Sequence, residues 1–362
     1  MYNRTPGKGL IGSTVSLISL SLLLVACGSP DTSALPTPTP TAVRVNGFGT
    51  AANHVHSLLA LPPHVLVLAT HYGLFRSEDD GATWKEVAGG SGQLMDGLMT
   101  YSLSQSGVDP QRLYVLTQPV VRSSPRTPGL YTSTDQGRTW QLSIATVALT
   151  SSISIFLVEA GNETPNEVYI YLSELGALGL RISQDAGQHF SKTGTLPFGR
   201  ILGLRALPGA AGRLLAFGSD GIARSIDGGI HWEVIKGITG GVYDMAIAGP
   251  HSPIYASGDA GIFASLDGGA TFTLVHAQAS FNSLTVSPVQ PQVIYGKTGV
   301  GVYRSSDGGH TWKALPHISG NLAVLAVDPS DFSQIYLSLS YPTTVYRLDG
   351  SSGEWIPLTP PA

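Results

Sequence analysis

The chain has 362 residues, of which 42% are hydrophobic and only 12% charged, with 44 glycines and 24 prolines. This composition supplies a large core and favours many short strands and tight turns over helices. The formal net charge of −4 argues against a nucleic-acid partner, which needs a basic surface, and the single cysteine, Cys27, excludes an internal disulfide.

Residues 1–27 have the three parts of a bacterial export signal. Arg4 and Lys8 provide positive charge ahead of an apolar, small-residue stretch over residues 10–26. The sequence LVACG at residues 24–28 then resembles a lipobox, in which a peptidase cuts before a cysteine that becomes lipidated. An ordinary secretory signal and a short membrane helix are the alternatives. Because the only cysteine stands where lipidation needs it, we expect Cys27 to anchor the chain at the outer face of the bacterial cytoplasmic membrane.

Residues 28–44 are rich in proline and threonine. Such a stretch cannot pack a core and stays extended and solvated, so we expect a tether. Residues 45–362 then form the folded domain.

An eight-residue pattern, Ser-x-Asp-x-Gly-x-Thr/His-Trp/Phe, recurs along this domain. A worn copy over residues 348–355 follows six close ones. The aspartates of the six copies are Asp79, Asp135, Asp185, Asp227, Asp267 and Asp307. An aspartate that accepts backbone N–H bonds, a glycine at positive φ and a returning aromatic are what a hairpin turn requires. We therefore expect these aspartates to be structural, not catalytic or calcium-binding.

Each pattern follows the same series of predicted strands. An apolar strand such as residues 64–70 precedes a short strand that begins with glycine in six units, and Thr344 replaces that glycine in the seventh. An earlier strand, such as residues 55–61, and a last strand after the turn make four strands per unit. A four-stranded sheet cannot bury both its faces alone, so seven such units must stack radially. The sequence predicts an all-β, seven-bladed β-propeller and leaves open how the ring closes.

The repeated pattern is the Asp box, or BNR repeat, and the chain resembles the Asp-box propellers. Sialidases, xyloglucanase-type glycoside hydrolases, sortilin-like receptors and photosystem II assembly factors belong to this group. The chain is most similar to bacterial Asp-box lipoproteins that are often labelled glycosyl hydrolases by fold alone, through the segments HVHSL at residues 54–58 and THYGLF at residues 70–75. A sialidase would need an arginine trio that this chain does not assemble convincingly, and xyloglucanase-type enzymes carry an aspartate in the segment ATHYG, residues 69–73.

We label the strands of a blade A to D from the axis outward. The box joins C to D, so the B–C and D–A loops share the opposite face, where we expect function to lie. His54 and His56 alternate at the start of strand A, and His71 ends strand B of the same blade. These histidines could bind a ligand or converge on a divalent metal. The alternative is that they are hydrogen-bonded channel histidines, and no other cofactor is predicted.

Further candidates lie on the same face. Arg122 and Arg126 belong to the longest B–C insertion and, with Arg200, could grip an anionic ligand, although a surface loop explains the insertion equally well. Asp96, Glu174 and Asp244 are weak catalytic candidates, because a carboxylate pair at a suitable separation can hydrolyse glycosides.

Two functions remain in competition. The first is a non-catalytic binding or assembly module with a protein or glycan ligand on the loop face. The second is a sialidase-like or xyloglucanase-like glycoside hydrolase that acts on extracellular glycans. We favour binding, because the recognisable glycosidase constellations are missing.

Overall fold

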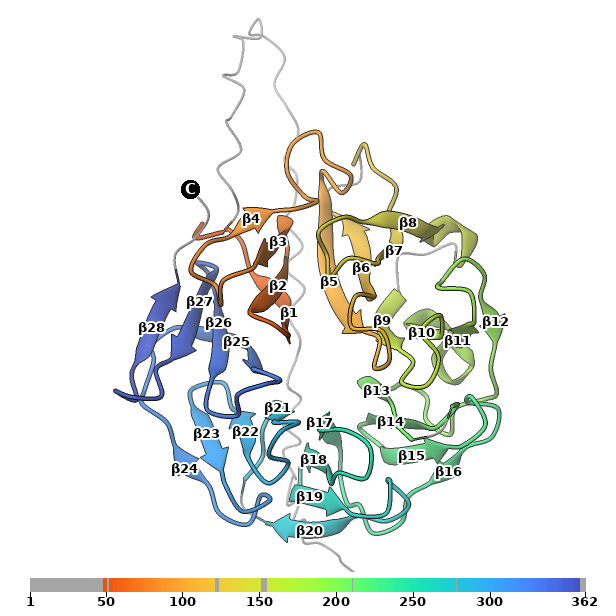
Figure 1. Ribbon diagram of the computed structural model, residues 1–362. Coiled ribbons are helices and arrows are strands. Elements are labelled where there is room, and N and C mark those ends of the chain that lie inside the picture. The colour runs from red at the N-terminus through yellow and green to blue at the C-terminus, as the bar shows by residue number, and fades with distance from the viewer. Residues whose placement is uncertain are drawn as a thin grey trace, which may run out of the picture. The chain divides into compact units, whose positions relative to one another are not determined.

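The computed structural model describes residues 48–50, 52–120, 124–150, 155–209, 211–277 and 279–358. They form seven antiparallel sheets, each built from four strands that are consecutive along the chain. The sheets are arranged in a ring, with the first strand of each sheet innermost (Figure 1). The predicted seven-bladed β-propeller is confirmed.

The blades follow one another in chain order. Blades one to three comprise β1 (Val55–Leu61), β2 (Val65–Thr70), β3 (Gly73–Ser77) and β4 (Lys85–Glu86); β5 (Leu98–Gln105), β6 (Leu113–Pro119), β7 (Gly129–Ser133) and β8 (Gln141–Ala145); and β9 (Ile155–Ala160), β10 (Val168–Leu172), β11 (Leu180–Ser183) and β12 (Ser191–Lys192). Blades four and five comprise β13 (Gly203–Ala206), β14 (Leu214–Gly218), β15 (Gly221–Ser225) and β16 (Glu233–Val234), then β17 (Val242–Ile247), β18 (Ile254–Gly258), β19 (Gly261–Ser265) and β20 (Thr273–His276). Blades six and seven comprise β21 (Ser283–Val286), β22 (Ile294–Lys297), β23 (Val302–Ser305) and β24 (Lys313–Ala314), then β25 (Asn321–Val327), β26 (Ile335–Ser340), β27 (Thr344–Leu348) and β28 (Trp355–Leu358). Two short 3-10 helices, η1 (Thr146–Ala148) and η2 (Ser173–Leu178), lie in loops.

The core of the described residues lies between the blades. Six of the seven second strands, β2, β10, β14, β18, β22 and β26, are buried at every position, because each sheet packs against a neighbour on both faces. Each hydrophobic cluster joins two adjacent blades; one of them contains Val67 of blade one and Val115 of blade two. The radial stacking expected from the repeat is therefore what buries the apolar strands.

The Asp boxes form tight turns with a shared hydrogen-bond pattern. In the second blade, Asp135 Oδ1 accepts from the Ser133 hydroxyl at 2.8 Å and from the Thr139 N–H at 2.9 Å. The Thr139 hydroxyl donates to Asp135 Oδ2 at 2.6 Å, and the Trp140 indole donates to the Gly137 carbonyl at 3.1 Å. The carboxylates of the other five boxes accept in the same way. This geometry gives the box aspartates a turn-forming role.

The ring closes between blades seven and one through the same kind of interface as elsewhere. Phe48 is 4% exposed and packs with Phe75 and with apolar side chains of the last blade. The Gly49 N–H donates to the Thr343 carbonyl at 2.8 Å. Each sheet takes all its described strands from one repeat. Closure among the described residues therefore rests on packing and on hydrogen bonds between blades seven and one, which include this bond and the Tyr341 N–H to the Asn53 carbonyl at 3.3 Å.

Candidate functional site

The loops of the ring divide between two faces. In blade one, the box residue Asp80 donates its N–H to the His64 carbonyl in the A–B turn at 3.0 Å, which places boxes and A–B turns together. On the other side, the Val120 N–H of a B–C connection donates to the Gly97 carbonyl of a D–A connection at 3.0 Å. We call the side with the B–C and D–A connections the loop face.

The loop face of blade one carries a cluster of three histidines, which we call the imidazole cluster. Metal-binding atoms of His54, His56 and His71 all lie within 4.8 Å of one another. The rings of His54 and His71 stack at a centroid distance of 4.7 Å, and those of His54 and His56 meet edge to face at 4.4 Å. The structure thus brings together the three residues that the sequence singled out.

The backbone of β1 and β2 explains how these side chains converge. The His71 N–H donates to the His54 carbonyl at 3.0 Å, so these two residues face each other just beyond the paired strands. His56 is an extra residue in β1, because the register shifts between Val55 and Ser57. Such a bulge turns a strand locally and re-aims a side chain, which here brings His56 to the other two imidazoles.

A buried asparagine holds the two segments that carry the cluster. The side-chain oxygen of Asn53 accepts from the N–H groups of His54 and Tyr72, both at 3.1 Å. Its amide nitrogen donates to the Thr70 hydroxyl at 3.2 Å, and its side chain is fully buried. Ser340 of blade seven adds a further link, because its hydroxyl accepts from the Val55 N–H at 3.0 Å. The cluster therefore sits on a rigid support.

The electrostatics of the cluster keep it uncharged near neutral pH. Burial lowers the pKa of His54, and burial together with the nearby His54 lowers that of His71. Burial, and then the charges that His54 and His71 would carry, lower the pKa of His56 to about 3. Neutral imidazoles expose nitrogen lone pairs, so the cluster is in the form that binds metal ions.

Aromatic side chains flank the cluster on the exposed side. Tyr72 is 42% exposed and stands edge to face against His71 at 4.6 Å. Tyr341, at the end of β26 in blade seven, is 53% exposed and lies 5.2 Å from the His54 ring. Together the rings form an uncharged, partly accessible surface where blades seven and one meet.

Sequence reasoning did not single out Asn53, Met99 or Tyr341. The Met99 sulfur lies 3.2 Å from Nδ1 of His71. In blade two, Met99 directly precedes the strand pair Thr100 and Thr117. In blade one, His54 directly precedes the equivalent pair, Val55 and Thr70. Met99 and His54 therefore occupy equivalent positions in the two blades. An alignment of the blades by strand register would have placed Met99 at the position of His54. The residue at that position differs between blades, whereas the box residues repeat.

The predicted carboxylates belong to different parts of the loop face. Asp96, in the connection between blades one and two, accepts from the Gly92 N–H at 2.8 Å. Arg126 donates to the Gly92 carbonyl at 2.7 Å, so it helps hold the same connection. Glu174, in η2 of blade three, is exposed and accepts from the Thr150 hydroxyl. Arg200 is exposed at the start of blade four.

Asp244 lies on the innermost strand of blade five, where its carboxylate links three blades. Oδ1 accepts from the Arg205 guanidinium of blade four at 2.9 Å, and Oδ2 accepts from the Leu284 N–H of blade six at 2.9 Å. Glu159 makes a similar link, because its Oε1 accepts from the Ala206 N–H at 2.9 Å. The innermost strand is a sheet edge whose N–H groups need partners, and these side chains supply them. The geometry therefore gives Asp244 a place in the joints between blades.

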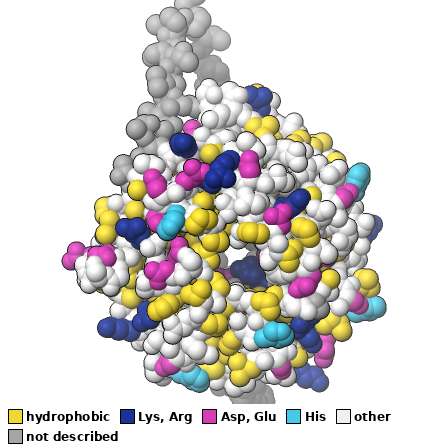
Figure 2. Space-filling view, in the orientation of Figure 1, with side chains coloured by type: hydrophobic (Ala, Val, Ile, Leu, Met, Phe, Trp, Pro, Cys, Tyr) yellow, Lys and Arg dark blue, Asp and Glu magenta, His cyan; other side chains and the backbone are white. Residues whose placement is uncertain are grey.

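Two predicted residues, Cys27 and Arg122, lie outside the described residues. On the face shown in Figure 2, acidic and basic side chains are interspersed with apolar ones, and the ring is hollowed at its centre. That face carries no extended basic surface in its described part.

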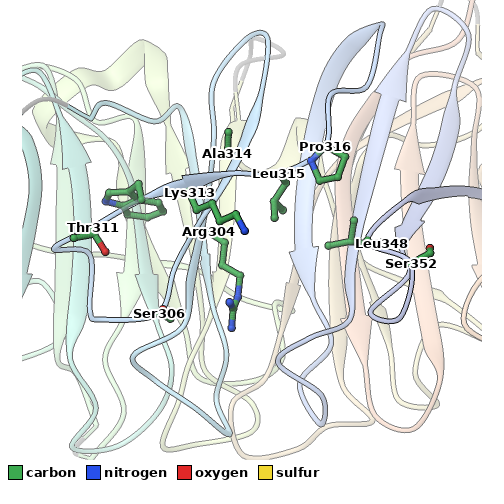
Figure 3. Close-up of a pocket in the computed structure, with 11 residues that line it drawn as sticks. Arg304, Ser306, Thr311, Lys313, Ala314, Leu315, Pro316, Leu348 and Ser352 are labelled. Carbon is green, nitrogen blue, oxygen red and sulfur yellow. The ribbon is translucent and has the colours of Figure 1, made fainter.

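A cleft of about 590 Å³ lies between blades six and seven, away from the imidazole cluster. Arg304, Lys313, Leu315, Leu348 and the worn box residue Ser352 line it (Figure 3). The last box departs from the pattern, because Leu348 replaces the box serine and the Trp355 indole donates to the Pro316 carbonyl at 2.9 Å, not to a box glycine. The cleft lies beside this altered turn.

Comparisons with known proteins agree with this architecture. The BNR/Asp-box repeat family model matches residues 131–142, the second box, and no curated protein matches the chain. A GH74 enzyme from Niastella koreensis has a TM-score of 0.66 at 14% identity, covering 85% of this chain and 55% of that one. The GH74 xyloglucanase from Xanthomonas campestris has a TM-score of 0.63 at 17% identity, covering 83% and 52%. The chain thus spans about half the length of these two structures.

YCF48 bound to D1 peptide has a TM-score of 0.57 at 16% identity, covering 80% of this chain and 95% of that one. At these identities the likeness shows the fold alone. Together with the box match, it supports the Asp-box propeller superfamily.

Proposed function

We propose that this chain is a non-catalytic binding module that takes a protein segment on its loop face, at the junction of blades seven and one. The observation that carries this proposal is the surface around the imidazole cluster. Its rings are uncharged and partly exposed, and Tyr72 and Tyr341 border them. Aromatic rings with a polar tip provide large contact areas at low entropic cost, as in protein interfaces.

The state of the carboxylates favours binding over hydrolysis. A glycosidase needs an acid and a nucleophile or base that are free to face the substrate. Both oxygens of Asp244 accept bonds that join blades, and Asp96 accepts a bond that shapes its own loop. These contacts account for the two carboxylates without any catalytic role.

The size of the domain also supports a protein ligand. The structural neighbour with a bound peptide, YCF48 with D1 peptide, is covered over 95% of its length, whereas about half of each GH74 structure lies outside the match. This chain is therefore similar in length to a propeller that binds a peptide.

We further propose that the module works outside the cytoplasm on a lipid anchor at Cys27. The lipobox-like sequence supports the anchor. An extended tether over residues 28–44 would reach roughly 50 Å at about 3.1 Å per residue, enough to hold the propeller clear of lipid headgroups. No helix within the described part of the chain is long and apolar enough to cross a membrane.

Site-specific photocrosslinking in cells tests the proposal. A photoreactive phenylalanine analogue would replace Tyr72, and a control chain would carry it at Thr271, which lies in an exposed box turn. We expect one protein to crosslink at position 72 and not at 271, and the additional change Tyr341→Ala to weaken that crosslink.

The competing function has its own signature. Release of reducing sugar from xyloglucan or a sialoglycan by the parent chain, lost in Glu174→Gln or Asp244→Asn variants that fold normally, would contradict a non-catalytic role. Glu174 is the informative position, because its side chain is exposed.

A further inference from the structure

The imidazole cluster places polar nitrogen atoms where the fold offers them no partner. Nδ1 of His54 and Nε2 of His56 are buried and have no hydrogen-bond partner among the described residues. A buried polar group without a partner costs on the order of 1–3 kcal/mol, and native proteins keep few of them. Apolar residues would fill the same space without that cost, so the arrangement points to a ligand for these nitrogens.

The spacing suits a single metal ion. Two nitrogens bound tetrahedrally at about 2.1 Å from one ion lie about 3.4 Å apart. The three donor atoms here lie within 4.8 Å of one another. Rotation of the imidazoles about their side-chain bonds can close a difference of that size, since the rings already meet at centroid distances of 4.4 and 4.7 Å.

The donor chemistry selects the kind of ion. The cluster contains imidazoles and no carboxylate. Calcium and magnesium prefer oxygen ligands, whereas neutral imidazole suits zinc, copper, iron and nickel. Three imidazoles with one open position are a ligand set that zinc accepts in tetrahedral geometry. The Met99 sulfur, 3.2 Å from Nδ1 of His71, adds a soft donor at the edge of the cluster. Soft thioether ligands favour Cu⁺.

The support of the cluster resembles that of a built metal site. The buried Asn53 side chain fixes the backbone of His54 and Tyr72 and the side chain of Thr70. Groups beyond the first ligands that hold them in place typically contribute a factor of about 10–100 to metal affinity.

We propose that His54, His56 and His71 form a metal site that binds one Zn²⁺ or Cu⁺ ion through three neutral imidazoles, with Met99 beside the fourth position. The site goes beyond the proposed binding role, and the two stand independently. A chain that captures its protein partner but binds neither Zn²⁺ nor Cu⁺ at the cluster would keep the binding proposal and lose this one.

The test is a titration of the full chain, purified in detergent and stripped of metal. Zn²⁺ is added in air and Cu⁺ under anaerobic conditions, each against a competing chelator. We expect one equivalent of one of these ions to bind with submicromolar affinity. The variant His56→Gln, which keeps a similar volume, should lose at least about 100-fold in affinity, more than an outer group alone contributes.

Two controls keep the result interpretable. His317→Gln removes an exposed histidine of another blade and should bind as the parent does. Thermal unfolding of each variant shows whether it is folded, and His71→Gln repeats the test if His56→Gln is not. If the folded variants His56→Gln and His71→Gln bind Zn²⁺ and Cu⁺ as tightly as the parent chain does, the proposal is overturned.

The variant Met99→Leu distinguishes the two ions. A loss of tenfold or more in Cu⁺ affinity with unchanged Zn²⁺ affinity identifies copper as the ion of the site. Unchanged affinity for both ions, with Zn²⁺ bound at one equivalent, identifies zinc.

Discussion

The carboxyl group of Glu159 should make the propeller less stable as the pH rises from 5 to 8. Glu159 lies on β9 and accepts the Ala206 N–H of the next blade at 2.9 Å. Burial raises its pKa from the usual 4.5 to about 7, although the Arg205 charge and the Ala206 bond oppose that shift. The folded chain thus keeps a proton over a pH range in which the unfolded chain has released it.

The sign and size of the effect follow from linkage. The folded state binds the extra proton, so this contribution to stability is complete below about pH 4.5 and is lost as the pH rises through about 7. A pKa raised from 4.5 to about 7 corresponds to at most about 3 kcal/mol of stability, since a tenfold change in proton affinity is worth about 1.4 kcal/mol. The change Glu159→Gln keeps the acceptor for Ala206 and removes the titration.

The assay is urea unfolding of parent and Glu159→Gln chains at several pH values between 5 and 8. We expect the stability of the variant relative to the parent to grow by up to about 3 kcal/mol across this range. The histidines of the imidazole cluster change stability with pH in the opposite direction, because their pKa values are lowered, but they are common to both proteins and cancel. Parallel profiles, or a parent that gains on the variant as the pH rises, would show that Glu159 does not retain a proton in the folded chain.

Three further outcomes separate structural from functional residues. Asp135→Ala removes the acceptor of three box hydrogen bonds and should lower the free energy of unfolding in urea by about 1–2 kcal/mol. It should leave the Zn²⁺ affinity unchanged, and weaker Zn²⁺ binding would contradict a purely structural role of the box. Asn53→Ala should weaken Zn²⁺ binding by about 10–100-fold in the same titration, and unchanged affinity in a folded variant would show that the support is dispensable. Phe48→Ala, where blades seven and one meet, should lower the free energy of unfolding in urea by about 3–5 kcal/mol. A loss below about 1 kcal/mol would mean that closure of the propeller does not depend on the Phe48 side chain.

The architecture could be predicted because the Asp box is a local device. Its hydrogen bonds connect residues two to four positions apart, as between Ser133, Asp135 and Thr139, so the sequence itself carries the turn. The alternation of an apolar strand and a glycine-led strand then sets the repeat. Stacking of the repeats follows from burial, since a blade alone leaves both faces of its sheet exposed.

The candidate site could be predicted only in part. His54, His56 and His71 lie close in sequence, and strand alternation suggested that they meet. Their tight grouping also depends on the bulge at His56, which local patterns do not reveal. Met99 and Tyr341 come from neighbouring blades, the latter from the far end of the chain, so their place beside the cluster required the closed ring.

The inner carboxylates illustrate a second limit of the sequence. Asp244 and Glu159 sit on first strands, where a polar residue can face either a channel ligand or the backbone of the next blade. Only the contacts with Leu284 and Ala206 show that these carboxylates satisfy edge N–H groups.

Anomalous diffraction from crystals of the full chain grown with Zn²⁺ or, without air, with Cu⁺, recorded on both sides of the absorption edge of that metal, tests most directly whether the imidazole cluster is a metal site and the Asp boxes are structural. We expect one strong peak about 2.1 Å from nitrogen atoms of His54, His56 and His71 with one of the two ions. Peaks confined to the box carboxylates such as Asp135, or no peak at the cluster with either ion, would contradict this assignment.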